Sequence, residues 1–122
     1  MYNDEVVKSF FGVKYSNNKM PPMYNVTHLP EFKSYGNSGA SCISMAAQGG
    51  ASRIILLGFD CQHTNGKSHW HGDHPAHLAN AGLIDRWMEK YAEMKSEISG
   101  IINASRETAL TVFPRQSLES LL

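Results

Sequence analysis

The sequence lacks several features that would place a protein in a well-marked class. It contains no run of about eighteen apolar residues, so we expect no transmembrane helix. Its 11 basic and 11 acidic residues leave a formal net charge of zero, without the basic stripe typical of proteins that bind duplex nucleic acid. Residues 1–10 include acids where a secretion signal would be cationic. We therefore expect a cytoplasmic protein that binds neither membranes nor duplex nucleic acid.

Cysteine is also scarce, with Cys42 and Cys61 as the only two residues of this type. They form no CxxC pair, and an intracellular chain would keep both reduced. Cys42 lies in an apolar helical stretch, which predicts a small buried side chain. Cys61 directly follows a predicted strand and could face a pocket. Nothing nearby in sequence would lower the pKa of its thiol, so we expect a structural rather than a reactive role for it as well.

The first third of the chain is weakly patterned. The whole chain has 122 residues, of which 42% are hydrophobic, enough for one small domain with a modest core. Prolines and asparagines interrupt residues 1–35. Val6–Tyr15 has the pattern of a strand or a short helix, and Met23–Thr27 has that of a short strand. We predict that residues 1–35 form an extended N-terminal arm that wraps around the domain or a neighbouring subunit.

The pattern becomes clearer from residue 36 onwards. Gly36-Asn37-Ser38-Gly39 predicts a turn that contains a helix-capping residue, and Ala40–Gln48 then predicts a helix that Gly49-Gly50 ends. Arg53–Asp60 is a nearly continuous apolar run, which is typical of a parallel strand covered on both faces.

The rest of the chain continues the alternation of helices and strands. Leu83–Ile98 carries apolar residues at three- and four-residue spacing, which predicts a helix whose stripe packs in the core. Ile101–Asn103 predicts a short buried strand, and Ser117–Leu122 a final helical turn. The short connections favour right-handed crossovers and therefore an α/β fold with a mainly parallel sheet.

Candidate ligand-binding residues are expected at the carboxyl ends of these strands, where parallel sheets bind ligands. Gly36–Gly39 opens a helix there, and free amides at a helix start bind anions, with simple capping as the alternative. Ser38 either caps the helix or donates to the ligand. Asp60 can bind ribose, hold a metal or act as a general base, with capping of the following loop as the alternative. Asn103 ends the other strand at the same edge.

Two arginines follow the last predicted strand. Arg106 is well placed to pair with phosphate. For Arg115, further along the chain, surface solvation is the preferred interpretation.

Histidine is concentrated in one loop, since five of the six histidines lie between His63 and His77. Within it, His69-Trp70-His71-Gly72-Asp73-His74 matches, as letters, the HxHxDH zinc motif of metallo-β-lactamase-like hydrolases. That fold needs further metal ligands downstream, and no histidine follows His77. We therefore predict no cofactor and keep zinc as the alternative. Its ligands would be His69, His71, Asp73 and His74.

The same loop has two other interpretations. In the first, Trp70 stacks on a base or sugar ring while His71 or His74 contacts phosphate. In the second, the histidines bond only one another and the backbone.

Several segments together resemble a known family. They are Gly36–Gly39, Ile54–Asp60, His69–Pro75 and Ile102–Ser105, and the resemblance continues to residue 122. The chain resembles a family of bacteriophage proteins that look related to the DUF115 (MptE-like) group and, more distantly, to family 42 sialyltransferases. The resemblance implies a small Rossmann-like three-layer domain over residues 36–122, with a nucleotide or nucleotide-sugar pocket.

The resemblance also implies particular contacts. In the sialyltransferases a turn that matches Asn37, Ser38 and Gly39 lies against the cytidine nucleotide. The family has a further N-terminal βα portion where this chain has residues 1–35. That difference favours holding a nucleotide over transforming it.

Three functional hypotheses follow. The first is a binding module for a nucleotide or a nucleotide-derived signal, which would sequester a defence messenger in the host-cell cytosol. The second is a glycosyltransferase-like or pyrophosphoryl-transfer enzyme, and the third is a metal-dependent hydrolase. For an enzyme, the candidate catalytic residues are Asp60, His69, His71 and His74. In every case short strands leave apolar faces uncovered, so we expect a homo-oligomer with residues 1–35 as the exchanged arm.

Overall fold

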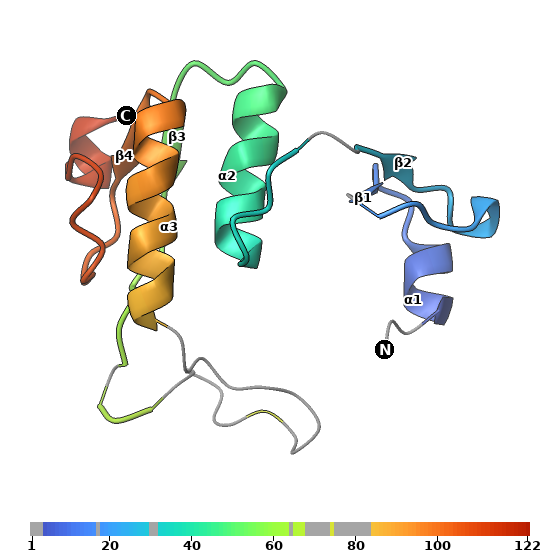
Figure 1. The fold of residues 1–122 in the computed structure, drawn as a ribbon, viewed down its shortest axis with the longest axis horizontal. Helices are drawn as coiled ribbons and strands as arrows, with labels where there is room; N and C mark the ends of the chain where they lie inside the picture. The colour runs from blue at the N-terminus through green and yellow to red at the C-terminus, as the bar shows by residue number, and fades with distance from the viewer. Residues whose placement is uncertain (1–3, 17, 30–31, 64, 68–73, 75–83) are drawn as a thin grey trace.

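The computed structural model describes residues 4–16, 18–29, 32–63, 65–67, 74 and 84–122. In this part the chain is mixed α/β, and its strands form two separate two-stranded sheets, both parallel. Figure 1 shows one sheet on each side of helix α2 (Ser38–Gln48). None of the described helices has the length and apolar character needed to cross a bilayer.

The arm, by which we mean residues 4–29, contains four short elements. They are helix α1 (Asp4–Ser9), strand β1 (Tyr15–Ser16), the 3-10 helix η1 (Pro22–Tyr24) and strand β2 (Thr27–His28). The strand predicted over Met23–Thr27 is wrong, because a proline at the first helical position starts a 3-10 turn there. Asn25, with φ of 49°, ends that turn in the left-handed region. Of the two alternatives for Val6–Tyr15, the structure has a helix at its start.

Helix α2 confirms the helix predicted after the glycine-rich turn. Asn37 caps it, since its side-chain Oδ1 accepts a hydrogen bond from the Ala40 amide at 2.8 Å. The capping residue is therefore Asn37, and Ser38 already lies in the first helical turn. The prediction that Cys42 is buried is wrong, because the buried positions at helical spacing are Ala40, Ile43 and Ser44, and Cys42 is exposed.

The second sheet pairs β3 (Ile54–Leu56) with β4 (Ile101–Asn103), with Ile54 opposite Ile101. The strand is shorter than the predicted Arg53–Asp60, and burial on both faces is wrong. Leu56 and Ile101 are buried, whereas Ile55, on the other face, is only half-buried. The apolar run thus extends beyond the hydrogen-bonded strand. On the far edge of β4, Asn103 forms a bridge with Arg115.

Helix α3 (Ile84–Glu97) supplies the largest part of the core, as its apolar stripe predicts. Tyr91 and Met94 are buried on it. The Tyr91 ring makes edge-to-face contacts with Phe59, at 6.3 Å between centroids, and with Phe113, at 6.0 Å. The predicted final helical turn is confirmed as η2 (Leu118–Ser120), capped by Ser117.

Polar contacts tie the segment before α2 to α3. Lys33 Nζ lies 2.6 Å from Glu93 Oε1 and 2.7 Å from Glu97 Oε1, and the Tyr35 hydroxyl donates to Glu97 Oε2 at 2.5 Å. Tyr35 is itself buried and has φ of 51°, in the left-handed region that large residues rarely adopt. Packing and the hydroxyl bond therefore hold this residue in place and bring the following turn against α3.

Tyr35 should make the protein sensitive to alkali. Burial and, next, the hydrogen bond to Glu97 raise the pKa of Tyr35 from 10.0 to about 12. Since the folded pKa is raised, folding is favoured while the phenol is protonated, and this contribution is lost as pH rises from 10.0 to about 12. Tyr35→Phe should therefore flatten the fall in unfolding free energy over that range. Urea denaturation at several pH values measures it, and identical slopes for the two proteins would contradict the prediction.

Candidate functional site

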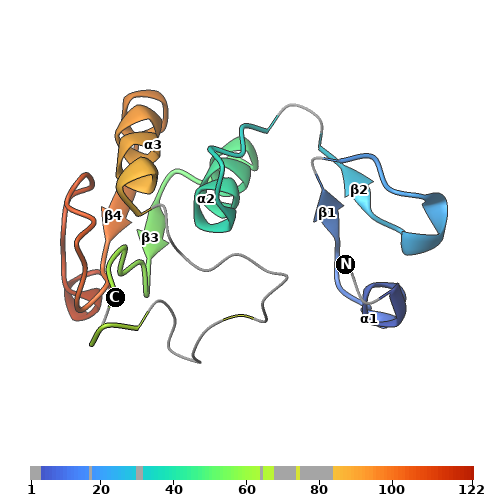
Figure 2. The same cartoon turned by 60° about the horizontal axis from the view of Figure 1, so that its bottom comes forward.

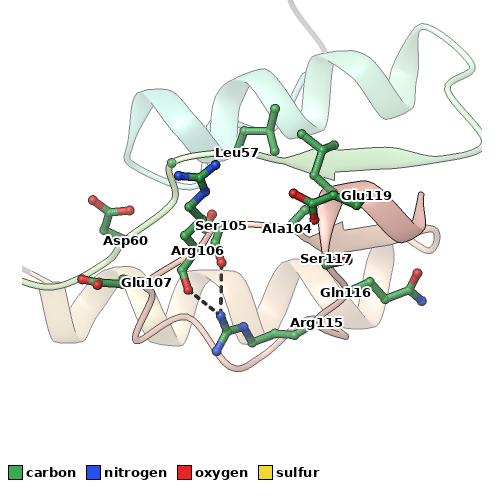
Figure 3. Close-up of a pocket in the computed structure, with 12 residues that line it drawn as sticks. Leu57, Asp60, Ala104, Ser105, Arg106, Glu107, Arg115, Gln116, Ser117 and Glu119 are labelled. Carbon is green, nitrogen blue, oxygen red and sulfur yellow. Dashed lines mark hydrogen bonds between the residues drawn. The ribbon is translucent and has the colours of Figure 1, made fainter. Parts of the chain in front are cut away.

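Two clefts open at the carboxyl ends of β3 and β4. The first, which we call the turn cleft, has a volume of about 570 Å³. It is lined by Gly36, Asn37, Ser38, Gly39, Gly58, Phe59, Asp60, Cys61, Trp87 and Tyr91. The second, which we call the arginine cleft, has a volume of about 760 Å³ (Figure 3). Its walls are the end of β3, residues 104–107 and residues 115–119.

The two clefts share Gly58 and Asp60. The structure thus brings the glycine-rich turn and Asp60 to one cleft, and places Arg106 with Asp60 in the other. The Asp60 side chain is exposed, and among the described residues it forms no ion pair. Its carboxylate is therefore free to accept hydrogen bonds from ligand hydroxyls in either cleft.

The start of α2 presents backbone donors to the turn cleft. The Ala40 amide donates to the Asn37 side chain, and the Ser41 amide to the Asn37 carbonyl at 3.0 Å. Within the described part of the chain, the amides of Ser38 and Gly39 have no acceptor. Two unpaired donors at the positive end of a helix dipole favour an anion at this position.

The Asn37 side chain is only partly satisfied. Its Oδ1 accepts from the Ala40 amide and from the Tyr91 hydroxyl at 3.2 Å. Burial raises the pKa of Tyr91, so its hydroxyl remains a donor at neutral pH. Asn37 Nδ2 is buried and lacks a hydrogen-bond partner in the described structure. A buried donor without an acceptor destabilises the fold, and a ligand oxygen in the turn cleft is the kind of acceptor that would satisfy it.

Glycine is required at Gly36 and at Gly39 for different structural reasons. Gly36 has φ of +80°, and a Cβ there would meet no atom within 4 Å, so conformation alone selects glycine. A Cβ at Gly39 would lie 2.9 Å from Phe59 Cε1 and 3.1 Å from the Tyr91 hydroxyl. Gly39 therefore allows the helix to approach the aromatic wall closely, independently of any ligand.

The arginine cleft holds both predicted arginines. Arg115 Nη2 donates to the carbonyls of Ser105 and Arg106, both at 3.1 Å, as the dashed lines in Figure 3 show. Arg115 is exposed, as expected, and its two hydrogen bonds also fasten the loop after β4. In the described part of the chain, the Arg106 side chain has no hydrogen bond or ion pair. It is available to an anionic group in this cleft.

Asn103 lines neither cleft, because its side chain is fully buried. Its Nδ2 donates to the Leu110 carbonyl at 3.0 Å and to Thr108 Oγ1 at 3.3 Å, and its Oδ1 accepts from the Ser105 amide at 3.0 Å. Asn103 therefore positions the loop that carries Arg106, and all its polar atoms are used inside the chain.

We compared the chain with known proteins. No protein-family model, no curated protein and no solved structure matches it. The resemblance to the bacteriophage family therefore stays a prediction.

Several residues of the turn cleft were not predicted from the sequence. Trp87 and Tyr91 belong to the α3 stripe that was assigned to the core, although both carry a polar tip suited to a cleft wall.

Cys61 also lines the cleft, in agreement with the expectation that a residue directly after this strand could face a pocket. Burial, and then the neighbouring Asp60 charge, raise the pKa of its thiol, which agrees with a structural rather than a reactive cysteine.

The histidine loop lies largely outside the described residues. This applies to His69, Trp70, His71 and Asp73, while His74 is described. Among the described residues, no group of three or more His, Cys, Asp or Glu side chains is arranged to hold a metal ion. Zinc binding by this loop therefore stays an untested alternative.

Proposed function

We propose that this protein is a binding module that holds a nucleotide or a nucleotide-derived ligand in the turn cleft. One observation carries the proposal: unpaired helix amides, a free carboxylate and aromatic side chains line the same cleft. Its volume of about 570 Å³ lies in the range of roughly 300–1,000 Å³ typical of small-molecule sites.

Each part of a nucleotide has a matching group. Phosphate would accept from the amides of Ser38 and Gly39 and from Asn37 Nδ2, which all lack acceptors in the described structure. The Asp60 carboxylate would accept from ribose hydroxyls. The half-buried Trp87 indole offers a surface for the base. Arg106, across the shared Asp60, suits a further anionic group of the ligand.

The resemblance to bacteriophage proteins supports a specific setting for this binding. We propose a Rossmann-like three-layer domain that sequesters a nucleotide-derived defence messenger in the host-cell cytosol. The two parallel strands with ligand-binding groups at their carboxyl ends are consistent with such a domain.

Isothermal titration against mononucleotides, cyclic dinucleotides and ADP-ribose derivatives tests the proposal. We expect one of these classes to bind, and Asp60→Asn to weaken its binding at least about tenfold, because a carboxylate acceptor of ribose hydroxyls is lost. Glu89→Gln is the control, since Glu89 is an exposed acid on α3 that lines neither cleft. No binding by any of the three classes would refute the proposal.

A transferase is the second candidate function. It is favoured by one observation, that the unpaired Asp60 carboxylate lies where the two clefts meet and could act on groups held in both. In that case a nucleotide sugar would be turned over, and Asp60→Asn would abolish turnover. A bound ligand that is recovered unchanged after long incubation counts against it.

A further inference from the structure

The arm exposes an unusual amount of apolar surface. Eight large apolar side chains are exposed in the described structure, and six of them lie on the arm. Phe11 is 103% exposed, Val13 74% and Met23 66%. The other three are Val6, Phe10 and Tyr15. Such a concentration on 26 positions calls for a covering surface, because single scattered apolar residues are the usual pattern on a protein surface.

The exposed area is that of a protein interface. At about 200 Å² for each large apolar residue, the six exposures together amount to roughly 800 Å². This is close to the area of about 800 Å² that each partner contributes to a standard interface. Val6, Phe10 and Tyr15 also line one groove of about 320 Å³ on the arm.

In the part of the chain that the structure describes, one edge of strand β3 has no neighbouring strand. The Ile54 amide donates to the Gly100 carbonyl, and the Leu56 carbonyl accepts from the Ala104 amide, both at 2.9 Å. In a parallel pair the intervening Ile55 therefore directs its N–H and C=O to the opposite edge. The described residues place no strand on that edge. Leu57, just beyond β3, is 56% exposed.

The arm and this edge do not cover each other within one copy. Figures 1 and 2 agree that α2 stands between the β1–β2 sheet and the β3–β4 sheet. A second copy of the chain removes the conflict, because each copy carries both an uncovered arm and an uncovered strand edge. In a two-fold dimer the arm of each copy would contact the β3 edge of the other copy, so that both arms and both edges are covered.

We propose that two copies exchange their arms, so that the β1–β2 sheet of one copy extends the β3–β4 sheet of the other along β3. Both sheets are parallel, and each has only two strands, which is marginal for an isolated sheet. Their union is a four-stranded sheet with the apolar arm packed against the partner. This arrangement does not depend on the bound ligand.

Sedimentation equilibrium of the full chain tests the exchange, with Phe11→Asp as the variant and Leu122→Asp as its matched control. Both side chains are almost fully exposed, at 103% and 97%, so neither substitution removes a contact within one copy. We expect a wild-type mass of twice 13.6 kDa. Phe11→Asp should raise the dimer dissociation constant at least about tenfold, and Leu122→Asp should leave it unchanged. A monomeric wild type, or equal effects of the two variants, would overturn the proposal.

A second measurement identifies the edge that is used. In the exchanged dimer the Ile55 amide is paired with the partner's arm, so its hydrogen exchange should slow as protein concentration rises and return to the fast rate in Phe11→Asp. A dimer in which Ile55 exchange is independent of concentration would exclude pairing along β3.

Discussion

Replacing Gly100 by alanine should lower the free energy of unfolding by about 3 kcal/mol or more. Gly100 has φ of +76°, and a Cβ there would lie 2.3 Å from the Ser52 carbonyl oxygen, which is backbone and cannot rotate away. The Gly100 carbonyl also accepts the hydrogen bond from the Ile54 amide. The clash can therefore be relieved only if the N-terminal ends of β3 and β4, where the sheet begins, move apart.

Gly50→Ala is the matched control for this substitution. Gly50 has φ of +90°, but a Cβ there would meet no atom within 4 Å. In Gly50→Ala the free energy of unfolding should therefore fall only by the cost of placing alanine in the left-handed region, about 1–2 kcal/mol. Urea denaturation of the wild type and both variants measures the two losses. Equal losses would show that the Ser52 backbone moves away from the new Cβ without an energetic penalty, and would contradict the prediction.

Asn103→Leu should be comparably damaging, with an expected loss of about 3–4 kcal/mol. The substitution keeps the branched shape of a fully buried side chain but removes three hydrogen bonds. It leaves the Leu110 carbonyl and the Ser105 amide without their partner, and buried polar groups without a partner are the expensive case. Since Asn103 positions the loop of Arg106, ligand affinity in the arginine cleft should fall as well.

Two further variants separate the causes of that loss. Asn18→Leu is the control at an exposed asparagine and should change stability by less than about 0.5 kcal/mol. Thr108→Val removes the hydroxyl that bonds Asn103 Nδ2, the Phe59 carbonyl and the Leu110 amide. Combined with Asn103→Leu, its effect should be less than additive, because the two residues belong to one network. Strict additivity in chemical denaturation would contradict a shared network.

Helices α2 and α3 and strand β4 were predictable because the sequence pattern of each fits only one type of secondary structure. The apolar spacing over Leu83–Ile98 defines the buried face of α3, and Ile101–Asn103 is confirmed without change. The limits of prediction are equally specific. A continuous run such as Arg53–Asp60 does not reveal where hydrogen bonding stops or which face is covered, so Leu57 was wrongly assigned to a buried strand. Asn37 and Ser38 are both good caps, and only the backbone geometry selects Asn37.

The candidate site was predictable where sequence order alone places residues on one edge. The glycine-rich turn and Asp60 meet in the turn cleft because a helix start and a strand end lie at the same rim of a parallel pair. The aromatic wall was not predictable, because Trp87 and Tyr91 have the same spacing as the core residues of α3. Asn103 was predicted to contact the ligand. Instead its side-chain amide bonds to the chain that follows β4, whose path could not be derived from the sequence.

The segment between the clefts is fastened to the loop after β4 through both backbone polar groups of one residue, Phe59. The Phe59 amide donates to Ser105 Oγ at 2.8 Å, and the Phe59 carbonyl accepts from Thr108 Oγ1 at 2.6 Å. A group bound beside Phe59 in the turn cleft therefore also acts on the loop that carries Arg106. If both clefts bind ligands, we therefore expect them to be thermodynamically linked, so that occupation of one would change the affinity of the other by a factor that is the same in both directions.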